Sequence, residues 1–197
     1  TFVNLAVEAL AIEWPIPLEQ AELSAADRTH PQLADVTPVE PKQTLIIGAG
    51  GQLGRALIKA IPTAVPISRA TLDLASPGSA AGFDFTPYGI VINSAAYTGV
   101  DAAETEDGRR EAWAVNVGGV GALVGAARRH RFTLVHVSSD YVFDGTQTLH
   151  TESEPFSPLG VYGQTKAAGD ALVGTLPSFY LLRTSWVIGD GPNFVQT

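Results

Sequence analysis

Residues 44–54 read Thr-Leu-Ile-Ile-Gly-Ala-Gly-Gly-Gln-Leu-Gly, and this stretch decides the fold. Leu45 to Ile47 form a short apolar run that is typical of a strand buried on both faces of a parallel sheet. Gly48, Gly51 and Gly54 follow at G-x-x-G-x-x-G spacing, and a helical pattern opens directly after them. The stretch predicts a strand, a tight turn and a helix whose first N–H groups can bind a pyrophosphate. The alternative is a glycine-rich turn that binds no ligand.

From Thr44 onward, apolar strand-like runs alternate with helical patterns. This alternation predicts a parallel α/β sheet of the Rossmann type, doubly wound, with helices on both faces. Further strands are expected at 64–67, 89–93, 133–137 and 179–182, and helices at 109–129 and 161–176. Polar residues follow most of these strands, at 68–69, 94–98, 138–141 and 184–186. Ligands bind outside the carboxyl ends of such strands, so we expect the site at this edge.

The first 43 residues differ from the rest in their prolines, and only Leu18 to Arg28 could hold a short helix. We interpret 1–43 as a linker or the tail of an upstream domain, and 44–197 as a dinucleotide-binding domain. The chain begins at Thr1 and contains no methionine, which favours a piece of a longer polypeptide.

Composition excludes several classes of function. The chain of 197 residues has a formal charge of -8 and no basic run, which argues against nucleic acid or an anionic membrane as a partner. No signal or membrane-spanning segment is evident. The absence of cysteine excludes disulfides and Cys-ligated zinc, and it fits a reducing cytoplasm. The four histidines show no metal-ligand spacing.

Tyr162 and Lys166 are the residues that most directly indicate chemistry. Their spacing places both side chains on one face of a helix, one turn apart, and Ser139 ends the preceding strand. A nearby ammonium is expected to lower the pKa of Tyr162 from its ordinary value of about 10. Ser139 can hydrogen-bond a substrate carbonyl while Tyr162 protonates its oxygen as a nicotinamide delivers hydride. The alternative is a chance Tyr-x-x-x-Lys spacing beside ordinary turn residues.

Residues from 44 onward resemble the extended short-chain dehydrogenase/reductase family, and within it the dTDP-4-dehydrorhamnose reductase branch. The resemblance is carried by five segments: 48–54, 93–104, 137–145, 162–166 and 183–187. It implies an oxidoreductase that uses NADPH or NADH to reduce the 4-keto group of a dTDP-6-deoxyhexulose, giving dTDP-L-rhamnose for polysaccharide synthesis. It also allows a homodimer. In the family, residues further along the chain complete the lobe that binds the substrate, so this lobe is expected to be largely absent from residues 44–197.

The resemblance also assigns roles to residues. It implies a catalytic trio of Ser139, Tyr162 and Lys166. The cofactor would meet Tyr162 and Lys166 together with Gly48, Gly51, Gln52, Leu53, Gly54, Ser68, Arg69, Asp73, Leu74, Ala95, Ala96, Tyr97, Thr98 and Val137. The sugar nucleotide would meet Val100, Ser139, Asp140, Trp186 and Asn193. Arg69 follows the second strand and could pair with a 2′-phosphate, which favours NADPH, or be a solvated surface charge. Trp186 could instead be a core or interface aromatic.

One further departure and two alternatives bear on this interpretation. Some relatives hold Mg²⁺ through a carboxylate in the first turn of the glycine-loop helix, but Arg55-Ala56 stand there, so no metal is expected. A 4,6-dehydratase of the same fold would need a glutamate after Asp140, where Tyr141 stands. The regulatory subunit of methionine adenosyltransferase resembles this branch too, and would bind NADP without turnover.

The first segment has a resemblance of its own. Residues 11–15 and 23–27 are similar to the C-terminal tail of dTDP-4-dehydrorhamnose 3,5-epimerase. This implies an epimerase fused to the reductase. A generic proline-rich linker is the alternative.

Overall fold

The computed structural model describes residues 3–76 and 78–189, and the chain divides into two compact units, Thr1–Pro41 and Lys42–Thr197. The first unit holds the short helices η1 (Glu8–Leu10), α1 (Ala25–Thr29) and η2 (Leu33–Asp35). The helix expected over Leu18 to Arg28 is shorter and starts later. Ser24 begins it through a capping box with Asp27, in which Asp27 N lies 3.1 Å from Ser24 Oγ.

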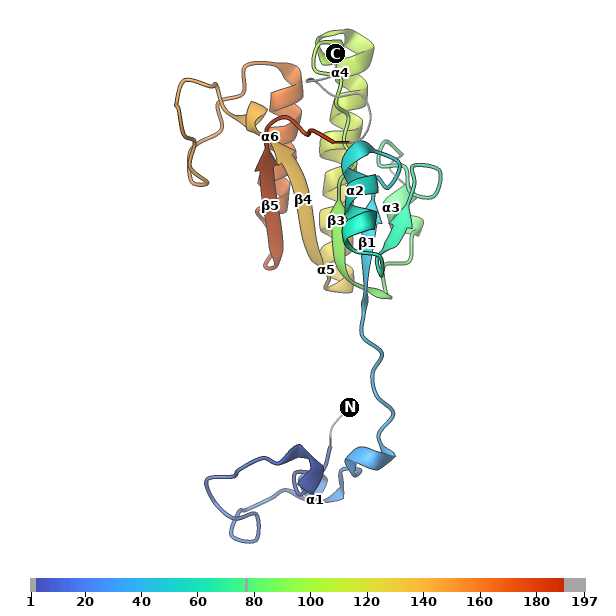
Figure 1. Cartoon of the computed structure of the whole chain (residues 1–197), viewed down its shortest axis with the longest axis vertical. Coiled ribbons are helices and arrows are strands. Elements are labelled where there is room, and N and C mark those ends of the chain that lie inside the picture. The colour runs from blue at the N-terminus through green and yellow to red at the C-terminus, as the bar shows by residue number, and fades with distance from the viewer. Residues whose placement is uncertain (1–2, 77, 190–197) are drawn as a thin grey trace. The chain divides into compact units, whose positions relative to one another are not determined.

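The second unit is an α/β sheet whose strands are all parallel. Among the described residues five strands form it, in the order β2-β1-β3-β4-β5 (Figure 1). The strands are β1 (Gln43–Ile47), β2 (Val65–Ile67), β3 (Tyr88–Asn93), β4 (Thr133–Ser139) and β5 (Phe179–Thr184). The helices are α2 (Gln52–Ala60), α3 (Ser79–Gly82), η3 (Ala102–Glu104), α4 (Glu106–Trp113), η4 (Ala114–Gly119), α5 (Val120–His130), η5 (Asp140–Val142) and α6 (Val161–Val173). The expected Rossmann-like architecture is confirmed.

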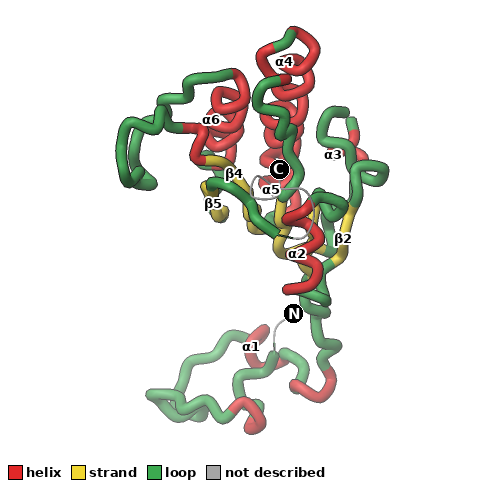
Figure 2. The backbone as a smooth tube through the Cα atoms, turned by 45° about the horizontal axis from the view of Figure 1, so that its top comes forward, coloured by secondary structure: helices red, strands yellow, loops and turns green. Residues whose placement is uncertain are grey.

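The sheet has helices on both faces because its strands are apolar on both sides. Leu45 and Ile47 point to one face, where they join a core with Val120 and Leu123 of α5 and Val173 of α6. Ile46 and Ile92 point to the other face, against Leu57 and Ile58 of α2 and Ile61 directly after it. In Figure 2 the strands lie between α2 on one side and α4, α5 and α6 on the other. Alternate residues of one strand therefore serve two cores.

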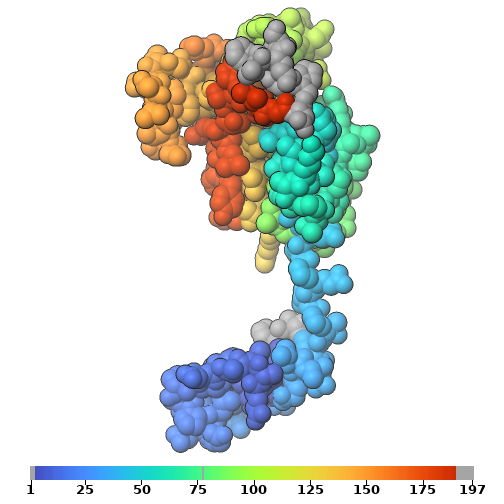
Figure 3. Space-filling view, viewed as in Figure 1, coloured from blue at the N-terminus to red at the C-terminus, as the bar shows by residue number. Residues whose placement is uncertain are grey.

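On the α2 face the sheet is covered only in part. Tyr180 and Leu182 of β5 pair with Val135 and Val137 of β4, and they are 63% and 50% exposed. Figure 3 shows the orange-red surface of β5 open beside α2. Among the described residues, no helix is both long and apolar enough to cross a membrane.

The long helix expected over 109–129 is interrupted. α4 and α5 are joined by a π-helical segment, Ala114–Gly119. In a π-helix the backbone hydrogen bonds join residues five apart in the chain, instead of the four of an α-helix. This segment turns Asn116 inward, where it is 2% exposed. Periodicity predicts the helix but not this local widening.

Candidate active site

The glycine turn after β1 opens the site. Gly48 adopts φ +85°, and a Cβ there would lie 2.7 Å from the backbone nitrogen of Ala95 on the neighbouring strand end. Gly54, inside α2, sits against the turn so closely that a Cβ would overlap the carbonyl oxygen of Gly48. Only glycine fits both positions. The turn can therefore hold the first residues of α2 close to the carboxyl ends of β1 and β3.

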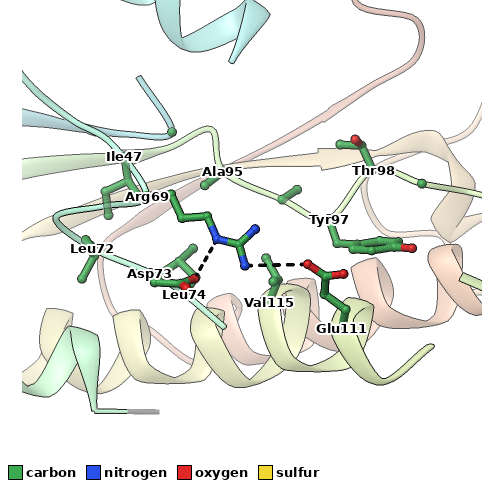
Figure 4. A pocket seen from close by; sticks show the side chains of 13 residues that line it. Ile47, Arg69, Leu72, Asp73, Leu74, Ala95, Tyr97, Thr98, Glu111 and Val115 are labelled. Carbon is green, nitrogen blue, oxygen red and sulfur yellow. Dashed lines mark ion pairs between the residues drawn. The ribbon is translucent and has the colours of Figure 1, made fainter. Parts of the chain in front are cut away.

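Two adjoining pockets of about 340 and 520 Å³ lie along this edge of the sheet. The first is lined by Arg69, Asp73 and Leu74 after β2 and by Tyr97 after β3 (Figure 4). The second is lined by the glycine turn and the trio expected from the sequence, at Gly51, Gln52, Leu53, Val137, Ser139, Tyr162 and Lys166. Gly48, Ala95, Ala96 and Thr98 line both pockets, so the two form one continuous trough.

The residues of this trough fit a dinucleotide. Gly51 caps α2 without a side-chain hydrogen bond, so the first N–H groups of the helix are left for an anion. Gln52 Nε2 is buried in the described structure with no hydrogen-bond partner. An orphaned donor beside a helix N-terminus is a ready partner for a phosphate oxygen. Gly54 and Ser68, also assigned to the cofactor, are not among the residues that line these two pockets. Gly54 is buried beneath the turn, and the carbonyl of Ser68 accepts from Thr71 N and Leu72 N.

Asn116 ties the wall of the trough to the helix that carries Tyr162. Its Oδ1 accepts from Tyr97 N at 2.9 Å, and its Nδ2 donates to Tyr97 O at 3.2 Å and to Thr165 Oγ1 at 3.0 Å. Thr165 in turn donates to the carbonyl of Tyr162 at 2.7 Å. Sequence reasoning missed this residue. An asparagine among the apolar positions of a long helical pattern is the signal that marks it.

Asn116→Ala is expected to lower the free energy of unfolding by about 2–4 kcal/mol, because it removes three hydrogen bonds and leaves partly buried backbone groups of Tyr97 unpaired. Thr165→Val removes one of the three hydrogen bonds of Asn116 together with the bond from Thr165 to the Tyr162 carbonyl, and should cost about 1–2 kcal/mol. Chemical denaturation of both variants checks this order. An equal loss in the two would show that Asn116 contributes nothing beyond its contact with Thr165.

Ser139 and Tyr162 face the second pocket from the end of β4 and the first turn of α6. Ser139 Oγ accepts from Tyr141 N at 3.2 Å and donates to Asp140 Oδ1 at 3.2 Å. The Tyr162 ring meets Tyr141 edge to face, with centroids 5.6 Å apart. Burial raises the pKa of Tyr162 above its ordinary value, while a hydrogen bond with Ser139 acts in the opposite direction. The expected lowering is thus not found in the free protein, and the phenol stays protonated at neutral pH.

Lys166, one turn further along α6, is buried too. The residue is 3% exposed, and its ammonium donates to the carbonyl of Val137 at 2.9 Å. Burial lowers the pKa of Lys166 to about 8, and Asp170, one turn further along α6, opposes that shift. Asp170 is itself paired with Arg183 Nε at 3.0 Å. Burial also lowers the pKa of the neighbouring His136 to about 3, so this histidine is neutral.

Because Lys166 is buried, we expect the free energy of unfolding to depend on pH. The unfolded chain keeps the lysine proton up to about pH 10, whereas the folded chain releases it near pH 8, so burial costs stability below pH 8. This cost disappears as pH rises from about 8 to about 10. Lys166→Met should therefore stabilise the fold by about 1–3 kcal/mol near pH 7, and by much less near pH 10. Urea denaturation at several pH values tests this, and a pH-independent difference would contradict it.

The residues assigned to the sugar nucleotide are brought together only in part. Val100 and Asp140 line a further pocket together with Tyr162 and Gly163 of α6, whereas Ser139 lines the second pocket of the trough. Asp140 Oδ2 accepts from Ser185 Oγ at 2.7 Å, which ties the end of β5 to this region. Trp186 is 58% exposed beyond β5. Asn193 lies outside the described residues. Within those residues no cluster of three His, Cys, Asp or Glu is placed to hold a metal ion.

Comparison with known proteins gives a consistent picture. The family model described as RmlD substrate binding domain matches residues 42–197. The dTDP-4-dehydrorhamnose reductase of Aggregatibacter actinomycetemcomitans is 44% identical over 163 residues, covering 78% of this chain and 54% of that protein. A probable dTDP-4,6-dihydroxy-2-methyloxan-3-one 4-ketoreductase of Streptomyces antibioticus is 39% identical over 163 residues, covering 78% and 54%.

Among solved structures, dTDP-4-dehydrorhamnose reductase from Bacillus anthracis in complex with NADP superposes with a TM-score of 0.74. It is 32% identical, covering 80% of this chain and 58% of that one. The chain thus spans about half the length of the curated relatives it matches.

Proposed function

Because this chain belongs to the RmlD substrate binding domain family of extended short-chain dehydrogenases/reductases, we propose that its protein reduces the 4-keto group of a dTDP-6-deoxysugar. The finer proposal is that NADPH is the reductant and dTDP-4-dehydrorhamnose the substrate, giving dTDP-L-rhamnose in the cytoplasm. The convergence of Ser139, Tyr162 and Lys166 on a dinucleotide-sized trough supports this most strongly. The relatives include reductases of two different dTDP-linked ketones, so the identity of the sugar in the substrate is part of the proposal.

The trough separates two tasks. Gly51, Gln52 and the first turn of α2 would hold the pyrophosphate, and Ala95 to Thr98 with Val137 would line the nicotinamide half. Bound NADPH would supply the hydride for the carbonyl carbon. No side chain of this chain needs to carry that hydride.

The chain's own residues supply the proton. Ser139 Oγ would donate a hydrogen bond to the substrate carbonyl oxygen, which draws negative charge onto that oxygen. The Tyr162 hydroxyl, kept protonated by its raised pKa, would then give its proton to the same oxygen. The Lys166 ammonium, held by the Val137 carbonyl, would favour the phenolate left behind. The product is an alcohol, and solvent returns the proton to Tyr162.

Absorbance loss of NADPH with dTDP-4-keto-6-deoxyglucose tests the reaction, with and without a separate 3,5-epimerase. Oxidation that requires the added epimerase supports the reductase alone. Oxidation without it, with a product epimerised at C3 and C5, supports in addition an epimerase fused upstream, which stays a prediction because the family match begins at residue 42. An unepimerised product would show direct reduction of the added ketone. NADPH binding with no turnover in either arm would refute the reductase and favour a regulatory subunit that binds the cofactor.

A further inference from the structure

Arg69 lies between two carboxylates in the pocket proposed for the adenosine half. Its Nε lies 3.3 Å from Asp73 Oδ1, and its Nη2 lies 3.7 Å from Glu111 Oε1. Figure 4 shows the guanidinium lying across the pocket between these two groups, which come from the loop after β2 and from α4. Arg69, Asp73 and Glu111 all line this pocket. The Arg69 side chain is 67% exposed, and its guanidinium is engaged by two partly exposed carboxylates before any ligand binds.

The two carboxylates differ in how firmly they are held. Asp73 Oδ1 also accepts a hydrogen bond from Ala75 N at 2.9 Å, and the backbone N–H of Asp73 donates to Ser79 Oγ at 2.9 Å. Asp73 is thus fixed by its own loop. The Glu111 side chain is 48% exposed and reaches Arg69 at the longer distance. Glu111 is the carboxylate that a competing anion could displace.

The charges of Arg69, Asp73 and Glu111 determine which of the two cofactors is disfavoured at this pocket. One guanidinium faces two carboxylates, so the three groups together carry a net negative charge. A 2′-phosphate, which distinguishes NADPH from NADH, adds between about one and two further negative charges at neutral pH. It would have to take the Nη2 side of Arg69 from Glu111 and would also be repelled by the glutamate. A free 2′-hydroxyl meets neither penalty and can donate to a carboxylate.

We propose that Glu111 is a cofactor-specificity residue: it occupies one side of the Arg69 guanidinium and thereby weakens binding of the 2′-phosphate of NADPH, but not of NADH. The inference rests on the proposed function only in taking the pocket as the site of the adenosine half. It assigns to α4 a part in cofactor choice that the glycine motif does not carry.

Glu111→Gln in the intact protein tests this, with NADPH and NADH dissociation constants measured by calorimetry. NADPH binding should tighten about 3- to 5-fold at low ionic strength, less at high salt, and NADH binding should change by less than about 1.5-fold. Glu106→Gln is the matched control, since it removes the same charge from the same helix. Glu106 pairs with Arg110 at 3.0 Å and is 91% exposed, and this variant should shift neither constant.

Three results would overturn the inference: no change with Glu111→Gln, an equal change for both dinucleotides, or the same NADPH gain with Glu106→Gln. The step through Arg69 has its own test: when Arg69→Gln is already present, Glu111→Gln should tighten NADPH binding by a smaller factor, because only the direct repulsion by the glutamate is then relieved. Failure of the wild-type protein to bind either dinucleotide would instead refute the proposed cofactor site, and this inference with it.

Discussion

Replacing Tyr162 with phenylalanine is expected to lower the rate of NADPH-dependent ketone reduction by about 1000-fold. The hydroxyl is the group that we propose protonates the substrate oxygen, and its raised pKa keeps that proton available. The ring itself remains, with its packing against Ala103, Ala112 and Val161. The dissociation constant of NADPH should therefore change by less than about 3-fold. Steady-state rates and calorimetry on the same preparation separate the two effects.

Tyr180→Phe is the control for this experiment. Tyr180 lies on β5 and is 63% exposed, so removing its hydroxyl should leave both the rate and NADPH binding unchanged. A Tyr162→Phe variant that keeps more than about a tenth of the wild-type rate would contradict its role as the proton donor.

Gly54→Ala is expected to have the largest effect on stability, with a loss of about 3–5 kcal/mol in the free energy of unfolding. The added methyl group would overlap the backbone carbonyl of Gly48, and a backbone atom cannot rotate away as a side chain can. Either α2 moves off the turn or the turn opens. Both changes also displace the first N–H groups of the helix, so NADPH binding should be lost.

Gly50→Ala is the matched control, because it adds the same methyl group two residues from Gly48. A Cβ at Gly50 meets no atom within 4 Å. That variant should change stability by no more than about 0.5 kcal/mol. Urea denaturation compares the two, and equal stabilities would mean that close packing of α2 on the turn does not matter.

The strands after Thr44 were predictable because a strand that is buried on both faces consists of consecutive apolar residues, and such runs are visible in the sequence. Each expected strand overlaps an observed one, although β4 and β5 continue two residues further, to Ser139 and Thr184. The first and last residues of helices were harder to predict. The short helix near the start depends on one cap at Ser24. The π-helical segment around Asn116 depends on a change in backbone hydrogen bonding that produces no recognisable repeat of apolar residues.

The site was predictable where function follows a strand end or a helical spacing. Ser139, Tyr162 and Lys166 meet one pocket because β4 and α6 each place them by local geometry. Partnerships between distant segments were not predictable. Asn116 contacts Thr165, and Arg69 contacts Glu111, across more than forty residues of chain. The pKa of Tyr162 was misjudged because spacing shows the lysine beside it but not the burial around it.

The most direct measurement uses NADPH carrying deuterium at the transferable position of its nicotinamide, with the 4-keto-6-deoxysugar nucleotide and epimerase. Mass spectrometry and proton NMR of the sugar then locate the label. Reduction of the ketone predicts one deuterium at C4 of the product, and none when Tyr162→Phe replaces the wild-type protein over the same period. A product with no deuterium at C4, or an unchanged ketone beside bound NADPH, would contradict the proposed reaction.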